Sequence, residues 1–352
     1  MNLTASIYPS FVFWNILLGL ILTLVLGQVA IWFARLTGLM DLPGALPHKQ
    51  HKVSTPLAGG LTIVLVLVIG GCGFNLSMIK QFWPVFLPTL IIFGVGLWDD
   101  FKHLPPWVKF TGQIIGAVLL IILGTYVKII KENFLGLQEQ ITLIVNWLIT
   151  LIWIIGITNA FNFIDSMDGL AIGMSGIAIA FLVLVVLPSS QVVLLQLLTL
   201  MLGICIGLFF YNLTPARLFL GDSGAQTIGF LLAVVSILYT PQNYPQASSW
   251  FVPILILGIP IFDMCLVVFS RLRRKTAIYQ AERNHTYHRL VDFGLDTPHA
   301  VAAMHLAAIL LGCFAFVALN LQPLYANLVF GLACLSGLAI LLFFDWKWEK
   351  HG

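Results

Sequence analysis

Apolar stretches of about 20 residues recur along this 352-residue chain, with only short polar segments between them. A helix that crosses a bilayer needs about 20 predominantly apolar residues. A mean hydropathy of +1.00, with only 9% charged residues, excludes an ordinary soluble domain. The sequence therefore predicts an all-α, polytopic integral membrane protein, with residues 1–352 in a single transmembrane domain. Eleven spans are expected, at residues 11–34, 57–79, 81–98, 107–127, 141–158, 169–187, 191–211, 223–240, 250–270, 299–319 and 325–344.

The basic residues are distributed unevenly between the two sets of connecting loops. With eleven spans and the N-terminus outside, fourteen Lys and Arg residues fall in one set and three, Lys80, Lys128 and Lys131, in the other. Because cytoplasmic loops are enriched in Lys and Arg, the richly charged loops and the C-terminus are predicted to be cytoplasmic. Most of the acidic residues lie on the same side, which indicates a polar site there.

The cysteines and the net charge exclude two other kinds of site. All five cysteines fall inside apolar spans and show neither metal-ligand spacing nor a disulfide framework. The net charge of +3 arises in loops that face anionic membrane lipids, so no nucleic-acid partner is predicted.

Five polar segments on the predicted cytoplasmic side hold most of the residues that could carry chemistry. In the first of them, Lys49 is either a topology anchor or a substrate contact, and the sequence leaves both open. The five segments lie near residues 35–56, 99–106, 159–169, 212–223 and 271–298.

Asp99 and Asp100 form an acidic pair at the C-terminal end of the third predicted span. The helix dipole already places partial negative charge at that end, and the two carboxylates also repel one another. A structural acidic pair is better placed at a helix N-terminus. The pair therefore favours a bound cation or phosphate chemistry.

The third segment carries a polar residue at every third position: Asn159, Asn162, Asp165 and Asp168. In a helix, each step of three residues falls about 60° short of a full turn, so neighbours share a face while the ends diverge. Helix capping would explain one or two of these residues but not all four. The pattern predicts contacts with different parts of one extended ligand.

The last two segments combine a Gly-rich turn with a basic group. Gly221–Gly224 precedes a predicted helix, where glycine permits close approach and the helix N-terminus can bind phosphate; an ordinary N-cap is the alternative. His285, His288 and Arg289 are spaced i, i+3 and i+4, which predicts a cationic stripe on one helical face, suited to a diphosphate rather than to zinc. Asp263, inside a span, is expected either to be functional or to make a helix-packing hydrogen bond.

Carboxylates and amides are hard oxygen ligands of the kind that Mg²⁺ binds together with phosphate oxygens. The five motifs, in this order, resemble the polyprenyl-phosphate N-acetylhexosamine-1-phosphate transferase family, glycosyltransferase family 4. That family includes phospho-N-acetylmuramoyl-pentapeptide transferase and bacterial undecaprenyl-phosphate N-acetylglucosamine-1-phosphate transferases. The resemblance covers most of the chain and rests on Gly38–Pro43 with Pro56, Gly59 and Gly60, on Asp99–Asp100, on Asn159–Gly169, on Gly221–Gly224 and on His285–Arg289.

The resemblance implies transfer of an N-acetylhexosamine-1-phosphate, with N-acetylglucosamine favoured, from a UDP-sugar to undecaprenyl phosphate, with release of UMP. The product would be the first lipid-linked intermediate of a cell-envelope polysaccharide such as O antigen or teichoic acid. The resemblance also implies Mg²⁺ as cofactor, with Mn²⁺ as a substitute, and a site on the cytoplasmic face of the bacterial inner membrane. A homodimer is an assembly that it allows.

By similarity, Asp222 is expected to bind the metal, with Asn162 as a second contact. Asp99, Asp100 and Asp222 are expected to be catalytic, the first two at the lipid phosphate. Among the substrate contacts, Asp168 is expected at the uracil and the histidines at the diphosphate. The full set of expected substrate contacts is Lys49, Asn159, Asp165, Asp168, His285, His288 and Arg289.

The chain departs from the family pattern at two positions. Ser166 stands where the family usually has glycine, and Tyr287 stands where a third histidine is common. The second departure disfavours the muramoyl-pentapeptide branch, which stays the alternative within the family. Outside it, a secondary transporter would place its polar groups near the bilayer midplane. An intramembrane aspartyl protease would have glycine where this chain has Phe219.

Overall fold

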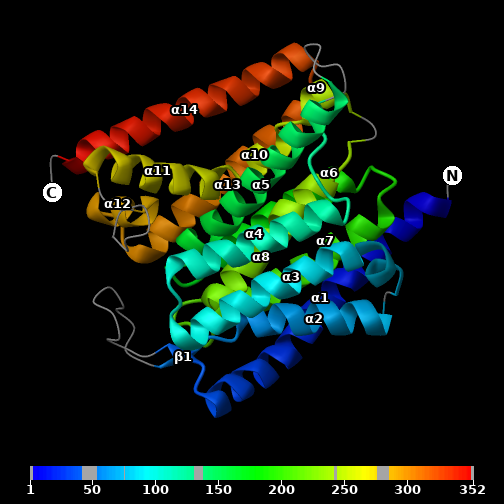
Figure 1. The fold of residues 1–352 in the computed structure, drawn as a ribbon, viewed down its shortest axis with the longest axis vertical. Helices are drawn as coiled ribbons and strands as arrows, with labels where there is room; N and C mark the ends of the chain where they lie inside the picture. Colours follow the sequence, from blue (N-terminus) through cyan, green and yellow to red (C-terminus); the bar gives the residue numbers. More distant parts are fainter. Residues whose placement is uncertain are drawn as a thin grey trace.

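A computed structural model describes residues 3–41, 54–74, 76–130, 138–241, 244–275 and 285–349, which form a helical bundle with one small hairpin (Figure 1). The elements are α1 (Leu3–Thr37), β1 (Met40–Asp41), β2 (Thr55–Pro56), α2 (Gly59–Phe74), α3 (Leu76–Lys102), α4 (Pro106–Ile122), α5 (Glu139–Ile164), α6 (Leu170–Val186), α7 (Val192–Asn212), α8 (Gly221–Leu238), α9 (Gln246–Ser249), α10 (Val252–Ile256), α11 (Gly258–Arg274), α12 (Thr286–Asp292), α13 (Thr297–Leu319) and α14 (Pro323–Glu349).

Every predicted span falls on one or more helices, but these helices differ in length. In the described part of the chain, seven helices are long and apolar enough to cross a membrane, or eight if one bent pair counts as a single span. Three other predicted spans fall on shorter apolar helices, Gly59–Gly73, Pro106–Ile122 and Leu170–Val186. At 1.5 Å per residue, a helix of this size reaches only about 25 Å, less than the roughly 30 Å of a bilayer core.

Two expected boundaries are corrected by the structure. The expected span at 250–270 is not one straight helix, because α9 and α10 meet α11 at a bend of 65°. Pro253, Gly258 and Pro260 lie around that bend, where proline removes a helical hydrogen bond and glycine tolerates a change of direction. The expected span at 57–79 is also too long, because α2 ends at Phe74 and α3 begins at Leu76.

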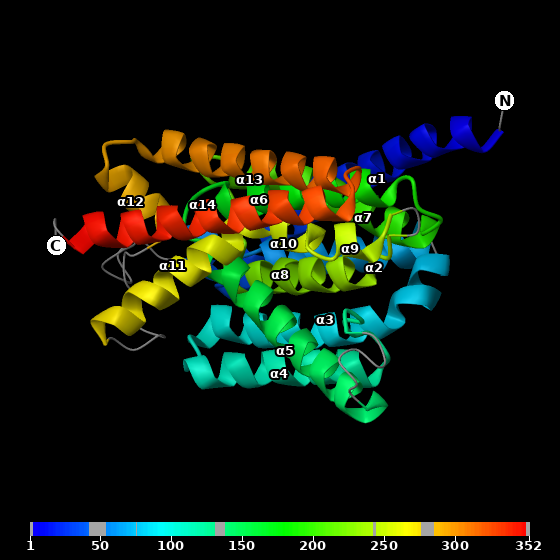
Figure 2. The same cartoon turned by 90° about the horizontal axis from the view of Figure 1, so that it is seen from above.

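Helix α8 lies at the centre of the bundle and α14 at its edge (Figures 1 and 2). Of the apolar window in each helix, 78% of α8 and 6% of α14 are buried inside the protein. Helices α2, α3 and α5 pack directly on α8. A Cβ at Gly59 would lie 2.6 Å from Leu220 Cα, and one at Gly96 would lie 2.6 Å from Ser223 Cα. Glycine at both positions therefore lets the N-terminus of α8 approach its neighbours closely.

The short hairpin connects the first polar segment to the segment before α8. Strands β1 and β2 pair antiparallel, with Met40 opposite Pro56. The chain continues into a parallel bridge between Leu57 and Phe219, and Phe219 N donates to Pro56 O at 2.9 Å. Within the described residues, the all-α prediction is correct except for this hairpin, and the adjacent bridge joins the first polar segment to the fourth.

The polar connections gather at one end of the bundle. The connection between α3 and α4, the helix α12 and the C-terminal end of α14 all lie at that end, whereas α1 begins at the opposite end (Figures 1 and 2). Residues from the second, third, fourth and fifth polar segments are thereby brought to the same side of the molecule.

Candidate active site

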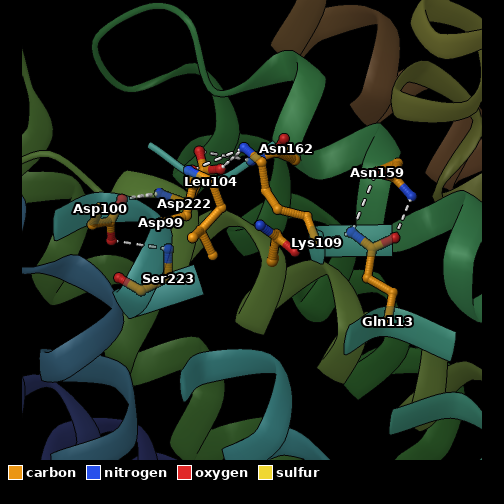
Figure 3. A network of polar contacts seen from close by, with 10 residues as sticks. Asp99, Asp100, Leu104, Lys109, Gln113, Asn159, Asn162, Asp222 and Ser223 are labelled. Carbon is orange, nitrogen blue, oxygen red and sulfur yellow. Dashed lines mark hydrogen bonds and ion pairs between the residues drawn. The ribbon is translucent and has the colours of Figure 1, made fainter. Parts of the chain in front are cut away.

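Lys109 bridges two of the predicted catalytic carboxylates. Its Nζ lies 2.5 Å from Asp222 Oδ2 and 2.8 Å from Asp99 Oδ2 (Figure 3). Asp222 lies in the first turn of α8, Asp99 in the last turn of α3, and Lys109 in the first turn of α4. The Lys109 and Asp222 side chains are 25% and 26% exposed, so this pair is within reach of a ligand from outside the bundle.

Asp99 is held in place by the segment that follows α3 in the chain. Its Oδ1 accepts a hydrogen bond of 2.6 Å from Leu104 N, and its Oδ2 binds Lys109. The carboxylate is 8% exposed. Asp99 therefore orients the Lys109 ammonium and presents little surface of its own.

Asp100 caps the N-terminus of α8. Its Oδ1 accepts from Asp222 N at 2.7 Å and its Oδ2 from Ser223 N at 3.1 Å. The two negative charges lie at the C-terminal end of α3, where the helix dipole disfavours them, but groups outside α3 stabilise both carboxylates. Asp100 faces the positive end of the α8 dipole, and Asp99 faces an ammonium group. These two contacts offset the unfavourable position of the pair at the end of α3 without any bound ligand.

Gly221 makes the cap of α8 possible. Its φ is +67°, and a Cβ there would lie 2.8 Å from both carboxylate oxygens of Asp100. Gly221→Ala is expected to destabilise the protein by about 1–2 kcal/mol from the backbone conformation alone. It should also lower activity, because Asp222 is the next residue. The melting temperature and the initial rate check this, with Gly94→Ala in the open face of α3 as the matched control. Equal stability of the two variants would contradict it.

The two asparagines of the third segment have different partners, although neighbouring positions of the pattern were expected to share a face. Asn162 Nδ2 donates to Asp222 Oδ1 at 3.1 Å. Asn159 Nδ2 donates to Gln113 Oε1 at 2.7 Å, and Gln113 Nε2 in turn donates to Gln226 Oε1 at 3.0 Å. Asn162 therefore belongs to the carboxylate cluster, while Asn159 belongs to a row of hydrogen-bonded amides beside it (Figure 3).

The two aspartates of the third segment lie in the turn that follows α5. Asp165 is the C-cap residue of α5, and Asp168 Oδ2 accepts from Ala216 N at 3.2 Å. Burial, followed by the negative charges of Asp222, Asp100 and Asp168, raises the pKa of Asp165 well above its usual value. These acids therefore share one electrostatic environment, which a bound cation would stabilise.

The fifth segment places its histidines close together, next to the third segment. His285 is the N-cap residue of α12, and its ring centroid lies 6.3 Å from that of His288 and 6.1 Å from that of Phe163. Tyr287 OH lies 2.6 Å from His288 Nε2, and its ring stacks on His285 at 5.8 Å. Tyr287, the departure from the family pattern, is thus part of this aromatic cluster.

The predicted cationic stripe is wrong in one respect. Arg289 is fully buried and donates from Nη2 to Ser270 Oγ at 3.2 Å, so it packs α12 against α11. The interval of four residues put it near His285 along the sequence, but the α11 surface covers that side of the short helix. A direct contact between Arg289 and substrate stays a prediction.

For two residues singled out from the sequence, Lys49 and Ser166, the structure gives little or no information about a role. Lys49 lies outside the described residues. Ser166, the other departure from the family pattern, is exposed in the turn after α5 and makes a 3.5 Å contact with Phe163 O.

The ligands expected for Mg²⁺ are present as a group of oxygens. Among the described residues, no three His, Cys, Asp or Glu side chains form a cluster of metal-ligand geometry. Asp99 and Asp222 nevertheless already bind a shared cation, the Lys109 ammonium, and Asn162 adjoins Asp222. Two carboxylates and an amide suit a hard divalent cation that completes its coordination with phosphate oxygens and water. The residues therefore fit Mg²⁺.

Sequence reasoning missed Lys109, Gln113 and Gln226 as members of the site. Lys109 was counted only as a basic residue on the cytoplasmic side. The available signal was its position, the second lysine after the acidic pair and ten residues beyond Asp99, in a chain of few charges. Gln113 follows it one helical turn later on α4.

Comparison with known proteins agrees with this arrangement. The sequence model described as "Glycosyl transferase family 4" matches residues 82–240, which contain the acidic pair, Lys109, the third segment and the start of α8. A probable undecaprenyl-phosphate N-acetylglucosaminyl 1-phosphate transferase of Bacillus subtilis is 31% identical over 306 residues, covering 86% of this chain and 82% of the relative.

Two further relatives come from different branches. An undecaprenyl-phosphate alpha-N-acetylglucosaminyl 1-phosphate transferase of Escherichia coli O157:H7 is 26% identical and covers 81% of this chain and 78% of its own. A phospho-N-acetylmuramoyl-pentapeptide-transferase of Limosilactobacillus fermentum is 31% identical but covers only 54% of this chain and 61% of its own.

A polytopic helical bundle with a carboxylate and amide site at one end is the architecture of a membrane-embedded transferase. The chain belongs to glycosyl transferase family 4, the polyprenyl-phosphate sugar-phosphate transferases.

Proposed function

We propose that this protein transfers N-acetylglucosamine-1-phosphate from UDP-N-acetylglucosamine to undecaprenyl phosphate and releases UMP. The observation that carries the proposal is the cluster of Asp99, Lys109, Asn162 and Asp222 at one end of an apolar bundle. A soluble nucleotide sugar and a lipid headgroup can meet there. The relatives that cover most of the chain bear names of this activity.

In the proposed reaction, an oxygen of the lipid phosphate bonds to the β-phosphorus of the UDP-sugar. The bond from that phosphorus to the bridging oxygen breaks, and the oxygen leaves as part of UMP. A phosphate monoester has a second pKa of about 6 and is mostly dianionic at neutral pH, so the attacking oxygen needs no general base. Catalysis then consists of alignment and charge neutralisation.

Each residue of the cluster has a role in that alignment. The Lys109 ammonium donates to phosphate oxygens, and Asp99 holds it in position. Asp100 fixes the N-terminus of α8, which aims Asp222 at the reacting groups. Asp222, with Asn162 as a second contact, would hold Mg²⁺, or Mn²⁺ in its place. When bound, the metal neutralises charge on the diphosphate.

The remaining predicted contacts come from the first, third and fifth polar segments. Asp165 and Asp168, in the turn after α5, lie on the side where the nucleotide would bind, with Asp168 at the uracil. His285 and His288 bind the diphosphate as donors. Lys49, outside the described residues, stays a predicted substrate contact.

We also propose the full topology expected from the sequence: eleven spans, an outer N-terminus and a cytoplasmic site in the bacterial inner membrane. The seven long helices, the bent pair and the three shorter helices together equal that number. The three shorter helices would cross a locally thinner bilayer or lie inside the bundle. A homodimer stays a prediction.

A phospho-N-acetylmuramoyl-pentapeptide-type reaction is the second candidate. The relative of that name supports it over about half of the chain, whereas Tyr287 departs from the dense histidine pattern. The two candidates share the acceptor and differ only in the sugar donor.

Purified protein supplied with undecaprenyl phosphate and single UDP-sugars tests the proposal. UMP release is expected with UDP-N-acetylglucosamine, much less with UDP-N-acetylmuramoyl-pentapeptide, and none after chelation of divalent cations until Mg²⁺ is restored. UMP release that persists in excess chelator would contradict the metal assignment, and a preference for the pentapeptide donor would favour the second candidate.

A further inference from the structure

A buried carboxylate on α11 holds the most prominent histidine of the fifth segment. Asp263 is fully buried, and its Oδ2 lies 2.8 Å from His285 Nδ1. Its Oδ1 accepts a 2.6 Å hydrogen bond from Thr286 N. Each carboxylate oxygen of Asp263 thus binds one of two consecutive residues, His285 and Thr286. This pair answers the question that the sequence left open for Asp263.

The arrangement fixes the position of the imidazole proton. An ionised carboxylate accepts hydrogen bonds but cannot donate them, so His285 must carry a proton on Nδ1. Among the described residues, none forms a hydrogen bond with the other ring nitrogen, Nε2. The His285 ring is 12% exposed and lies against the ring of Phe163 in the third segment. The guanidinium of Arg271 also lies over the Phe163 ring, 5.9 Å from its centroid.

We propose that Asp263 is a positioning residue: it holds His285 with the proton on Nδ1 and so directs Nε2 toward a phosphate group of the substrate. The inference rests on the proposed function, because it assigns a role to a diphosphate contact of that function. To donate to a phosphate oxygen, the imidazole first takes up a second proton from solvent at Nε2, which makes the ring an imidazolium. Asp263 stabilises that charged form and fixes the ring plane.

Asp263→Asn reverses the tautomer while keeping the shape of the side chain. An asparagine side chain has only one acceptor oxygen. That oxygen must face Thr286 N, because the backbone N–H can only donate and its position is fixed. The amide NH₂ is then turned toward His285 Nδ1, which must become an acceptor, so the proton moves to Nε2. His285 still donates to phosphate, but as a neutral rather than a charged group. Because charge-assisted hydrogen bonds are roughly twice as strong, we expect kcat/KM for the UDP-sugar to fall about tenfold.

A second variant separates this effect from damage to the fold. Thr286→Pro removes the competing backbone donor. Proline is tolerated at the first position of a helix, and His285, at φ −71° and ψ 156°, has the extended conformation favoured before proline. In the double variant D263N/T286P, the amide oxygen is no longer required at the backbone and can rotate to His285 Nδ1. The Nδ1-protonated tautomer and part of the lost kcat/KM should therefore return relative to D263N, with T286P alone as the reference.

A surface pair provides the matched control. Asp296 Oδ1 accepts from His299 N at 3.0 Å and also contacts His299 Nδ1, in the same combination of imidazole and backbone donor. Both side chains are exposed, at 62% and 75%, and take no part in the proposed site. Asp296→Asn is therefore expected to leave kcat/KM unchanged.

The test is ¹⁵N NMR of full-length protein labelled at histidine, with His285→Gln used to assign the His285 signals. Wild type should show a protonated Nδ1, and titration with UDP should shift the Nε2 resonance. D263N should show an unprotonated Nδ1 and a smaller UDP-induced shift. An unprotonated Nδ1 in wild type, or an Nε2 signal that UDP does not move, would overturn the proposal. Both readouts are independent of turnover. If they appear as expected but no UMP is released with undecaprenyl phosphate, the positioning role stands and the proposed reaction fails.

Discussion

Asp222→Asn is expected to reduce UMP release by at least about a thousandfold while leaving the protein folded. The substitution removes the negative charge that Lys109 and Asn162 share at the start of α8. The amide is close in shape to the carboxylate, and Asp100 bonds the backbone N of residue 222 rather than its side chain. The α8 cap should therefore survive. The initial rate and the melting temperature, measured on the same preparation, separate loss of chemistry from loss of fold.

Glu139→Gln is the control for that experiment. Glu139 is an exposed carboxylate in the first turn of α5, at the end of that helix opposite the site. Its neutralisation should leave the rate unchanged. A D222N rate within about threefold of wild type would remove Asp222 from the catalytic cluster, since a group that neutralises transition-state charge contributes far more than that.

Lys109→Met is expected to lower the rate at least about a hundredfold and to change how the protein responds to metal. Without the ammonium, Asp99 and Asp222 lose the cation that both bind. Unpaired, partly buried carboxylates destabilise the fold, so the melting temperature in the absence of divalent cations should fall. Mg²⁺ binding to the same oxygens would restore stability by mass action, as RT ln(1 + [Mg²⁺]/Kd).

The informative quantity is the Mg²⁺-induced rise in melting temperature, which should be larger in K109M than in wild type. Lys102→Met removes an exposed lysine from the last turn of α3 and is the control; its response to Mg²⁺ should equal that of wild type. A K109M protein that Mg²⁺ does not stabilise would mean that the metal binds elsewhere.

The sequence was sufficient to predict the apolar helices of the bundle, because each is an apolar segment bounded by polar residues. It was less informative about their ends. The break at Gly258 and the shortness of α2 depend on proline and glycine inside apolar stretches, where hydropathy alone gives no signal. The β1–β2 hairpin was not foreseen, because two residues a strand are too few for a periodic pattern.

The candidate site was partly foreseen, for a physical reason. Charged residues are costly in an apolar chain, so Asp99, Asp100, Asp222 and Asn162 were conspicuous one by one. Their partners were not, because contacts such as that between Asp100 and the α8 N-terminus join residues more than a hundred positions apart. Lys109 was masked by its second role as a basic residue beside the membrane. Arg289 shows the converse error, since helical spacing identifies a face but not what covers it.

The fate of the donor's β-phosphate tests the central claim most directly. UDP-N-acetylglucosamine labelled with ³²P at that position is incubated with the protein, undecaprenyl phosphate and Mg²⁺, and lipid and aqueous fractions are separated. The account predicts that the label enters the lipid together with the sugar, while unlabelled UMP appears in equal amount. Label that remains in the aqueous fraction as UDP, with sugar alone in the lipid, would show glycosyl rather than sugar-phosphate transfer and would contradict the account.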